Sequence, residues 1–220
     1  GFKNYLKMKR INILKKKIDN LQSSNESQYP HFIGSWNIEN DILCKEIINL
    51  FEENKNLQKK GVTVKGRNTI AKKTTDIAVS PNHLKDIKFK CLNDYINELY
   101  KCFIDYQSQW PFIKNTIQSV HIGPFNLQRY LPGDHFSKIH SERLSIETSH
   151  RVFAWMTYLN NVDDGATTNF SHYDIKIKPE IGKTLIWPAE WTHAHSGEIL
   201  NSGVKYIVTG WMHFPHDNKE

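Results

Sequence analysis

The chain has 220 residues, 39% of them hydrophobic and 12% aromatic, which suits one folded domain with appendages and excludes wholesale disorder. No apolar run reaches the roughly 18 residues that a membrane-spanning helix needs, and we expect no secretory signal. Three cysteines without a CxxC pair argue against a disulfide framework. We therefore expect a cytoplasmic protein, and the Lys-, Asn- and Ile-rich composition suggests the cytoplasm of a bacterial cell or a virus-infected host.

The net charge of +6 is concentrated at the N-terminus. Residues 1–20 carry seven basic groups and one acidic group, so the remaining 200 residues are neutral overall. A nucleic-acid-binding domain normally spreads basic surface over its fold. Nucleic acid is therefore not the expected partner.

The basic segment has helical periodicity, with apolar side chains at positions 11, 14, 18 and 21. This spacing predicts a short amphipathic helix, followed by a polar linker over residues 23–30. We expect residues 1–30 to form a basic N-terminal helix and linker, and residues 31–220 to form the main domain. The helix is interpreted as a self-packing or solvated extension, with a membrane-surface or partner-binding role as the alternative.

Two further helices are predicted before the chain turns to β-structure. The first follows a cap at Asn40 or Asp41 and carries an apolar stripe as far as Phe51. Residues 57–83 contain glycine, proline and short β-like pieces, and are expected to form an irregular connection. The second helix repeats apolar residues from Leu92 to Phe103 at helical spacing.

From residue 116 onward, short β-branched and aromatic runs alternate with turn signals. The predicted strands cover residues 120–131, 152–159, 168–177, 184–187, 193–199 and 204–214. The last of them is apolar on both faces up to Met212 and is expected to lie at the centre of a sheet. Helices followed by many antiparallel strands predict an α+β fold that closes on a barrel or jelly roll.

Two H-x-[DE] pairs could supply metal ligands, because side chains two residues apart on a strand point the same way. His172 and Asp174 fall on the polar face of an amphipathic strand, only 23 residues before His195. His140 and Glu142 follow a Pro-Gly turn, and His140 stands 55 residues before His195, which leaves room for several strands. We therefore favour His140 and Glu142. Two histidines and one carboxylate on one face of an ion suit non-haem Fe(II) oxygenases.

The third ligand is either His193 or His195, which share a face. Lys205 follows His195 by ten residues across a turn at residues 201–203, and a hairpin would bring the two side chains together. A lysine within an apolar run needs a partner when it is buried. We expect that partner to be the carboxylate of an anionic co-substrate, the alternative being a strand-end lysine that reaches solvent.

Several ordered motifs from residue 128 onward carry a family resemblance that spans about residues 31–214. The first are Tyr130-Leu-Pro-Gly133, Phe136, His140-Ser-Glu142 and the run from Arg151 to Asn160, which ends in Tyr-Leu-Asn. The later ones are Gly165-Ala-Thr-Thr168-Asn-Phe170, Trp187-Pro-Ala, His195, Gly203-x-Lys205-Tyr206 and Trp211. Together they resemble the prolyl 4-hydroxylase-like branch of the Fe(II)/2-oxoglutarate-dependent dioxygenases, of the bacterial and viral type. Many members have aspartate where this chain has Glu142, and one glycine of the family's GGxTxF turn is replaced.

The resemblance implies a double-stranded β-helix, or jelly roll, with supporting N-terminal helices. It implies that Fe(II) is held by His140, Glu142 and His195. It also implies that Lys205 binds the distal carboxylate of 2-oxoglutarate, assisted by Tyr158. The remaining implied residues are Tyr130 lining the pocket, Thr209 in a water-mediated contact, and Arg151 and Trp211 near the substrate mouth.

The reaction implied by the resemblance is hydroxylation by O2, with release of succinate and CO2 and with ascorbate as the reductant. A prolyl residue in a peptide or protein is the expected substrate, and free proline or another small molecule is an alternative. A nucleobase demethylase of the same superfamily relies on arginines after the distal histidine, but the last arginine here is Arg151. A non-catalytic jelly-roll module that holds a metal or sugar would not need a buried Lys205.

Overall fold

The computed structural model describes residues 30–62, 68–117 and 119–215. A compact unit begins at Ile33 and carries the fold. The helix predicted within residues 1–30, and nearly all of that segment, lie outside the described residues, so the proposed domain division stays a prediction. Within the described ranges, no helix has the length and apolar content needed to cross a membrane.

Both helices predicted for the main domain are present. Asn40 caps the first, because its side chain accepts a hydrogen bond from the Leu43 backbone N–H at 3.0 Å. The second helix is longer than its apolar stripe and buries Leu92, Leu99 and Phe103. The helices are α1 (Asp41–Glu53), α2 (Lys90–Gln109) and α3 (Pro111–Thr116), with 3-10 turns η1 (Lys55–Leu57), η2 (His83–Lys85), η3 (Ile87–Phe89), η4 (Ile146–Thr148) and η5 (Trp191–His193).

The strands of the described residues form two antiparallel sheets. The larger sheet has the order β1 (Gly34–Asn37), β10 (Lys183–Pro188), β7 (Arg151–Tyr158), β12 (Lys205–His213), β5 (Phe125–Tyr130), β3 (Thr75–Val79) and β2 (Lys59–Lys60), with β4 (His121–Ile122) on β12. The smaller sheet has the order β6 (Phe136–His140), β11 (His195–Gly197), β8 (Thr168–Phe170) and β9 (Ile175–Ile177). The central position predicted for the last strand is confirmed, since β12 pairs with β5 and β7.

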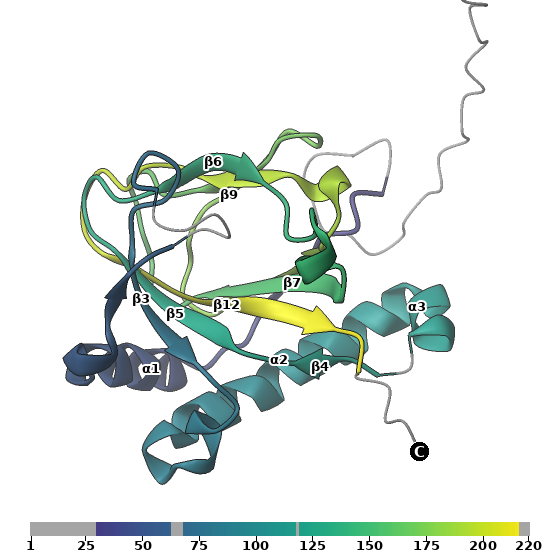
Figure 1. Cartoon of the computed structure of the whole chain (residues 1–220), viewed down its shortest axis with the longest axis horizontal. Helices are drawn as coiled ribbons and strands as arrows, with labels where there is room; N and C mark the ends of the chain where they lie inside the picture. The colour runs from purple at the N-terminus through teal and green to yellow at the C-terminus, as the bar shows by residue number, and fades with distance from the viewer. Residues whose placement is uncertain (1–29, 63–67, 118, 216–220) are drawn as a thin grey trace, which may run out of the picture. The chain divides into compact units, whose positions relative to one another are not determined.

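The larger sheet separates two apolar cores. Figure 1 shows α1 and α2 against one face of this sheet, with β6 and β9 on the opposite side. Alternation along each strand assigns its residues to the two cores. On β7, Phe153 and Trp155 pack toward the helices, whereas Met156 and Tyr158 face the space between the sheets. The interior between the sheets is therefore built from alternate residues of several strands, and the functional side chains lie there.

Four predicted segments differ from the structure. Residues 57–83 are not wholly irregular, because β3 joins the larger sheet beside β5. The strand predicted at 168–177 is two strands with a turn between them, and Asp174 has a left-handed backbone with φ of 54°. Residues 193–199 begin with η5 before β11 starts, and residues 120–131 divide into β4 and β5.

A chain of buried hydroxyl groups ties the helical layer to the larger sheet. Tyr95 Oη on α2 lies 2.7 Å from Thr157 Oγ1 on β7, which lies 2.7 Å from Thr184 Oγ1 on β10. All three side chains are fully buried. Removing the middle hydroxyl would leave the Tyr95 hydroxyl without a partner in an apolar core.

We expect Thr157→Val, which preserves shape, to lower the free energy of unfolding by about 1–3 kcal/mol, the cost of an unsatisfied buried polar group. Urea unfolding measures the change. Thr116→Val, at the exposed end of α3, is the matched control and should shift stability by less than about 0.5 kcal/mol. Equal effects of the two variants would show that the hydroxyl chain contributes no stability.

Candidate active site

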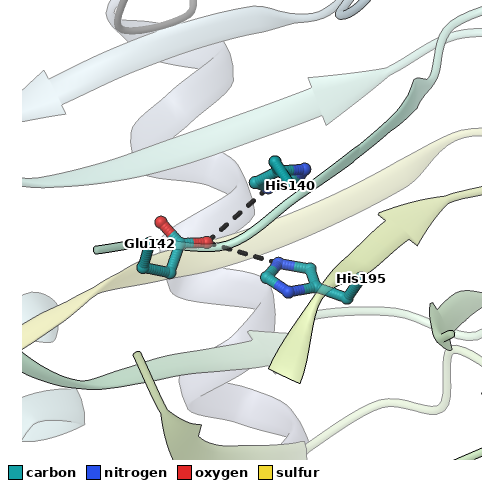
Figure 2. Close-up of side chains that lie close together, drawn as sticks. All are labelled: His140, Glu142 and His195. Atoms are coloured by element: carbon teal, nitrogen blue, oxygen red, sulfur yellow. Dashed lines mark ion pairs between the residues drawn. The ribbon is translucent and has the colours of Figure 1, made fainter. Parts of the chain in front are cut away.

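Three metal-ligating side chains meet between the two sheets. His140 ends β6, Glu142 follows it by two residues, and His195 begins β11 (Figure 2). Glu142 Oε1 lies 3.6 Å from His140 Nε2 and 3.3 Å from His195 Nε2. In the part of the chain that the structure describes, this is the one group of three or more such residues whose ligand atoms all lie within 4.8 Å of one another.

Each histidine is oriented by a backbone carbonyl two residues earlier in the chain. His140 Nδ1 lies 2.8 Å from the Lys138 carbonyl oxygen, and His195 Nδ1 lies 2.9 Å from the His193 carbonyl oxygen. A carbonyl oxygen only accepts hydrogen bonds, so each Nδ1 carries the proton. The Nε2 lone pairs are left facing Glu142, which is the form that a metal ion binds.

Aromatic rings surround both imidazoles. Phe136 stacks on His140 with ring centroids 3.8 Å apart. Phe170 and Trp187 approach His195 with centroid distances of 5.5 and 5.1 Å. These rings exclude water and fix the imidazole planes. The buried indole N–H of Trp187 has no hydrogen-bond partner among the residues that the structure describes.

Burial and neighbouring charge set the protonation of the site. Burial, reinforced by the neighbouring His195, lowers the pKa of His140 to about 4, so this imidazole is neutral at pH 7. Burial acts to raise the pKa of Glu142. The contacts with His195, His140 and Trp211 outweigh burial and lower this pKa to about 2. A neutral imidazole and an ionised carboxylate are the forms in which these groups bind a cation.

The second oxygen of Glu142 has its own partners. Trp211 Nε1 donates to Glu142 Oε2 at 2.6 Å. Arg151 Nη1 donates to the Glu142 backbone oxygen at 3.1 Å and lies 3.8 Å from Oε2. The Arg151 guanidinium carbon lies 3.7 Å from the centre of the Trp211 ring. Arg151 and Trp211, predicted at the substrate mouth, thus both contact Glu142.

Lys205 is buried between two tyrosines. Its side chain is 3% exposed, and its Nζ lies 4.8 Å from the Tyr130 ring centre and 5.5 Å from that of Tyr158. The Nζ donates to the Ala166 carbonyl at 2.8 Å, and no carboxylate of the described residues forms an ion pair with it. Burial lowers the pKa of Lys205 to about 7. The alternative of a strand-end lysine reaching solvent is wrong.

Lys205 and the metal-ligating group belong to one interior. Tyr158 Oη donates to Thr168 Oγ1 at 2.6 Å on β8. Two residues further on the same face of β8, Phe170 contacts the ring of His195. Tyr158, Phe170, Trp187 and Tyr130 are members of a single apolar cluster. The short strand β8 therefore connects the lysine and histidine ends of the site.

The hairpin expected between His195 and Lys205 is wrong. The strand β11 pairs with β6 and β8, whereas β12 pairs with β4, β5 and β7, so the two residues lie in different sheets. His193 is buried but lies outside the metal-ligating group. The rejected pair His172 and Asp174 lies in the exposed turn between β8 and β9.

Thr209 shares a face of β12 with Lys205, as predicted, and its hydroxyl donates to the Trp155 carbonyl at 2.9 Å. Tyr130 Oη donates to Gln128 Oε1 at 3.0 Å. Sequence reasoning missed the contact of Tyr158 with Thr168. It also missed the buried pair in which Lys72 Nζ lies 2.7 Å from an Asp76 oxygen, near Phe136. The strand pattern gave no signal for this pair, because Lys72 lies outside β3.

Comparisons with known proteins agree with this geometry. Residues 125–213 match the model of the 2OG-Fe(II) oxygenase superfamily. No curated protein matches the chain significantly. Among solved structures, a collagen prolyl hydroxylase of Paramecium Bursaria Chlorella virus-1, solved as a 2OG complex, is similar with a TM-score of 0.61 at 17% identity, over 87% of this chain and 99% of that chain.

Two cellular proteins have a similar fold. A prolyl-4-hydroxylase of Pseudomonas putida has a TM-score of 0.64 at 11% identity, over 84% of this chain and 94% of that chain. A Trichoplax adhaerens prolyl hydroxylase, in complex with a peptide fragment of the hypoxia inducible factor oxygen degradation domain, has a TM-score of 0.61 at 12% identity, over 83% and 84%. Residues 125–213 are thus a 2OG-Fe(II) oxygenase domain, and the chain is a dioxygenase whose cofactors are Fe(II) and 2-oxoglutarate.

Proposed function

We propose that this dioxygenase hydroxylates a prolyl residue in a peptide or protein, with His140, Glu142 and His195 as its iron ligands. The observation that carries the proposal is the pairing of this group with the buried Lys205 in one interior. The metal-ligating group alone would suit a non-catalytic metal module. A buried lysine without a carboxylate partner among the described residues would have no purpose in such a module.

The three side chains fit a divalent metal of the Fe(II) type. Both imidazoles have Nε2 free, and Glu142 directs one oxygen toward them, which is the two-histidine, one-carboxylate donor set. A bound Fe(II) supplies, with 2-oxoglutarate and O2, the oxidising power for hydroxylation, with succinate and CO2 as products. The residues of the chain hold these reactants and exclude water.

Lys205 fits the distal carboxylate of 2-oxoglutarate. The ammonium group is desolvated, and a carboxylate would supply the charge that its surroundings lack. The Tyr158 and Tyr130 rings flank Lys205, and the Tyr158 hydroxyl, held by Thr168, is proposed to assist. Thr209, whose proton is committed to a carbonyl, keeps an oxygen lone pair for a water molecule.

The antiparallel strands of the two sheets are proposed to form a double-stranded β-helix, the jelly roll implied by the family resemblance. The support is the enclosed interior between the sheets, with ligands from both β6 and β11, together with the similarity of the fold to three prolyl hydroxylases. Arg151 and Trp211 are proposed to lie at the mouth of this interior, beside Glu142, where a substrate would approach the metal.

The choice of a peptide substrate rests on the same three solved proteins, all prolyl hydroxylases, one of them with a bound peptide fragment. The cytoplasm is the proposed location, because Cys44, Cys91 and Cys102 are all free thiols. Ascorbate is the proposed reductant. Free proline is the alternative substrate that a peptide assay can reject directly.

Replacing Lys205 by methionine keeps its length and removes its charge. Losing one partner of a buried charge pair costs about 2 kcal/mol or more, so the dissociation constant of 2-oxoglutarate should rise at least about 30-fold. The metal-to-ligand charge-transfer band of the anaerobic Fe(II) protein reports this binding. Lys176→Met, at an exposed lysine of β9, is the control and should bind like wild type. Unchanged binding by Lys205→Met would show that Lys205 does not bind the carboxylate of 2-oxoglutarate.

The affinity for 2-oxoglutarate should fall as pH rises above 7. The groups that face Lys205 are Tyr130 and Tyr158, and burial raises the pKa of both phenols, so they stay neutral. The pKa of Lys205 is lowered to about 7, so the ammonium form that binds a carboxylate is progressively lost above that pH. Above pH 7, binding of 2-oxoglutarate requires Lys205 to take up one proton. The affinity should therefore fall about tenfold for each further pH unit.

Titrations between pH 7 and 8.5 at full metal occupancy test this dependence. Lys205→Arg keeps its charge throughout this range, so its affinity should not change with pH. The slope of affinity against pH is compared, since the arginine itself can alter the absolute affinity. Equal slopes in wild type and Lys205→Arg would assign the pH dependence to another group.

Proline-rich peptides should gain one oxygen atom on proline when incubated with the Fe(II) protein, 2-oxoglutarate and ascorbate. Tandem mass spectrometry locates the oxygen, and succinate formation measures turnover. His195→Ala should form neither product, because a donor of the metal site is lost. Oxidation of free proline with no change in any peptide would overturn the peptide proposal and leave the oxygenase chemistry intact.

A further inference from the structure

The two oxygens of the Glu142 carboxylate have different surroundings. Oε1 faces His140 and His195, whereas Oε2 accepts the Trp211 indole N–H at 2.6 Å. A bond this short between a neutral donor and an ionised acceptor is charge-assisted. The Glu142 side chain is only 13% exposed, so water cannot easily replace the indole. One oxygen is thereby fixed by the protein, and the other is left for a cation.

Trp211 is itself held from two sides. On β12 it pairs with Ala154 of β7, which fixes its backbone in the middle of the larger sheet. The Arg151 guanidinium stacks on its ring and also donates to the Glu142 backbone carbonyl. Trp211 and Arg151 therefore bracket Glu142, one at its carboxylate and the other at its backbone.

The contacts of Trp211 and Arg151 with Glu142 compensate for the greater length and flexibility of a glutamate at this position. Glutamate has one more methylene and one more rotatable bond than aspartate, so its carboxylate reaches further and has more conformational freedom to lose. Glu142 lies beyond the last residue of β6 and gains no restraint from the strand ladder. The Trp211 N–H supplies a fixed point at the end of the longer arm.

We propose that Trp211 is a positioning residue that holds the Glu142 carboxylate in its metal-binding orientation, with Arg151 holding Trp211. This inference rests on the proposed function, in which Glu142 is an iron ligand. It differs from a role in contacting substrate, because the geometry gives Trp211 an effect on metal binding in the absence of any substrate. The length of the Glu142 side chain and the Trp211 indole N–H are therefore expected to act together in metal binding.

Trp211→Phe removes the indole N–H and keeps an aromatic ring for Arg151. Hydrogen-bond partners behind metal ligands typically contribute 10–100-fold to metal affinity. We expect Trp211→Phe to raise the dissociation constant of Mn(II) about tenfold, with no peptide or 2-oxoglutarate present. Electron paramagnetic resonance of free Mn(II) measures this without relying on tryptophan fluorescence. Trp191→Phe, at a tryptophan that is 65% exposed, is the matched control and should bind Mn(II) like wild type.

A double-mutant cycle with Glu142→Asp tests whether the two residues act as one unit. The aspartate is too short to reach both the cation and the Trp211 N–H from the same backbone position. Trp211→Phe should therefore change Mn(II) affinity less than about twofold in the Glu142→Asp background. A tenfold loss in both backgrounds would show that Trp211 acts independently of the glutamate arm and would overturn the proposal.

The failure of this inference can be distinguished from the failure of the proposed function. Wild-type protein that binds no Mn(II) would overturn the metal site itself. Tight wild-type binding that is unchanged in folded Trp211→Phe would overturn the positioning role alone. Should Trp211→Phe fail to fold by circular dichroism, Arg151→Met replaces it, and wild-type Mn(II) affinity in that variant would equally overturn the bracket.

Discussion

The alternation of side chains along β12 is the constraint on which the site depends. Every second residue, including Lys205, Thr209 and Trp211, faces the interior between the sheets, while Val208 and Met212 pack toward the helices. Because β12 is hydrogen-bonded along both edges, by β5 and β7, its register is fixed. A slip of one residue would turn the lysine and the tryptophan into the helical core. One strand thus places Lys205 near one end of the interior and Trp211, the partner of Glu142, near the other.

The interior also contains two buried charges of opposite sign that do not neutralise each other. Glu142 is ionised, with a pKa lowered to about 2, and faces two histidines of which His140 is neutral. Lys205 has lost most of its hydration and has no carboxylate partner among the described residues. Each isolated charge is costly in an apolar setting. A divalent cation and a dicarboxylate would compensate the two together, so the chain alone forms an electrostatically incomplete site.

Local spacing was enough to single out His140, Glu142 and Lys205 as candidates, but not their neighbours in the fold. The two-residue step between His140 and Glu142 and the apolar run around Lys205 are each visible in a short stretch of sequence, although β6 ends at His140 and Glu142 lies just beyond it. The contact of Tyr158 with Thr168, and of Phe170 with His195, depends on which strands pair across the sheets. The prediction of one long strand over residues 168–177 was wrong, because a turn divides it, and residues of this turn contact a distant part of the chain: the Ser171 N–H donates to the Ala194 carbonyl at 3.0 Å, and the Tyr173 ring lies beside His193. The periodicity of a strand determines which face of the sheet a residue lies on. Which residues it contacts on that face depends on how the strands pair, and the sequence pattern does not show this.

The three side chains of the candidate metal site are held by different kinds of interaction, so their positions differ in how far they depend on the rest of the fold. His140 and His195 each donate to the carbonyl two residues earlier in the chain, that of Lys138 in β6 and that of His193 in η5, so their orientation is a local property of the chain. Glu142 lies beyond the end of β6 and depends on Trp211, which is 69 residues away in the chain. Any loosening of β12 against β7 would displace the carboxylate while leaving both imidazoles in place. The position of the Glu142 carboxylate therefore depends on the tertiary packing of β12, and it does so through its hydrogen bond from the Trp211 indole N–H.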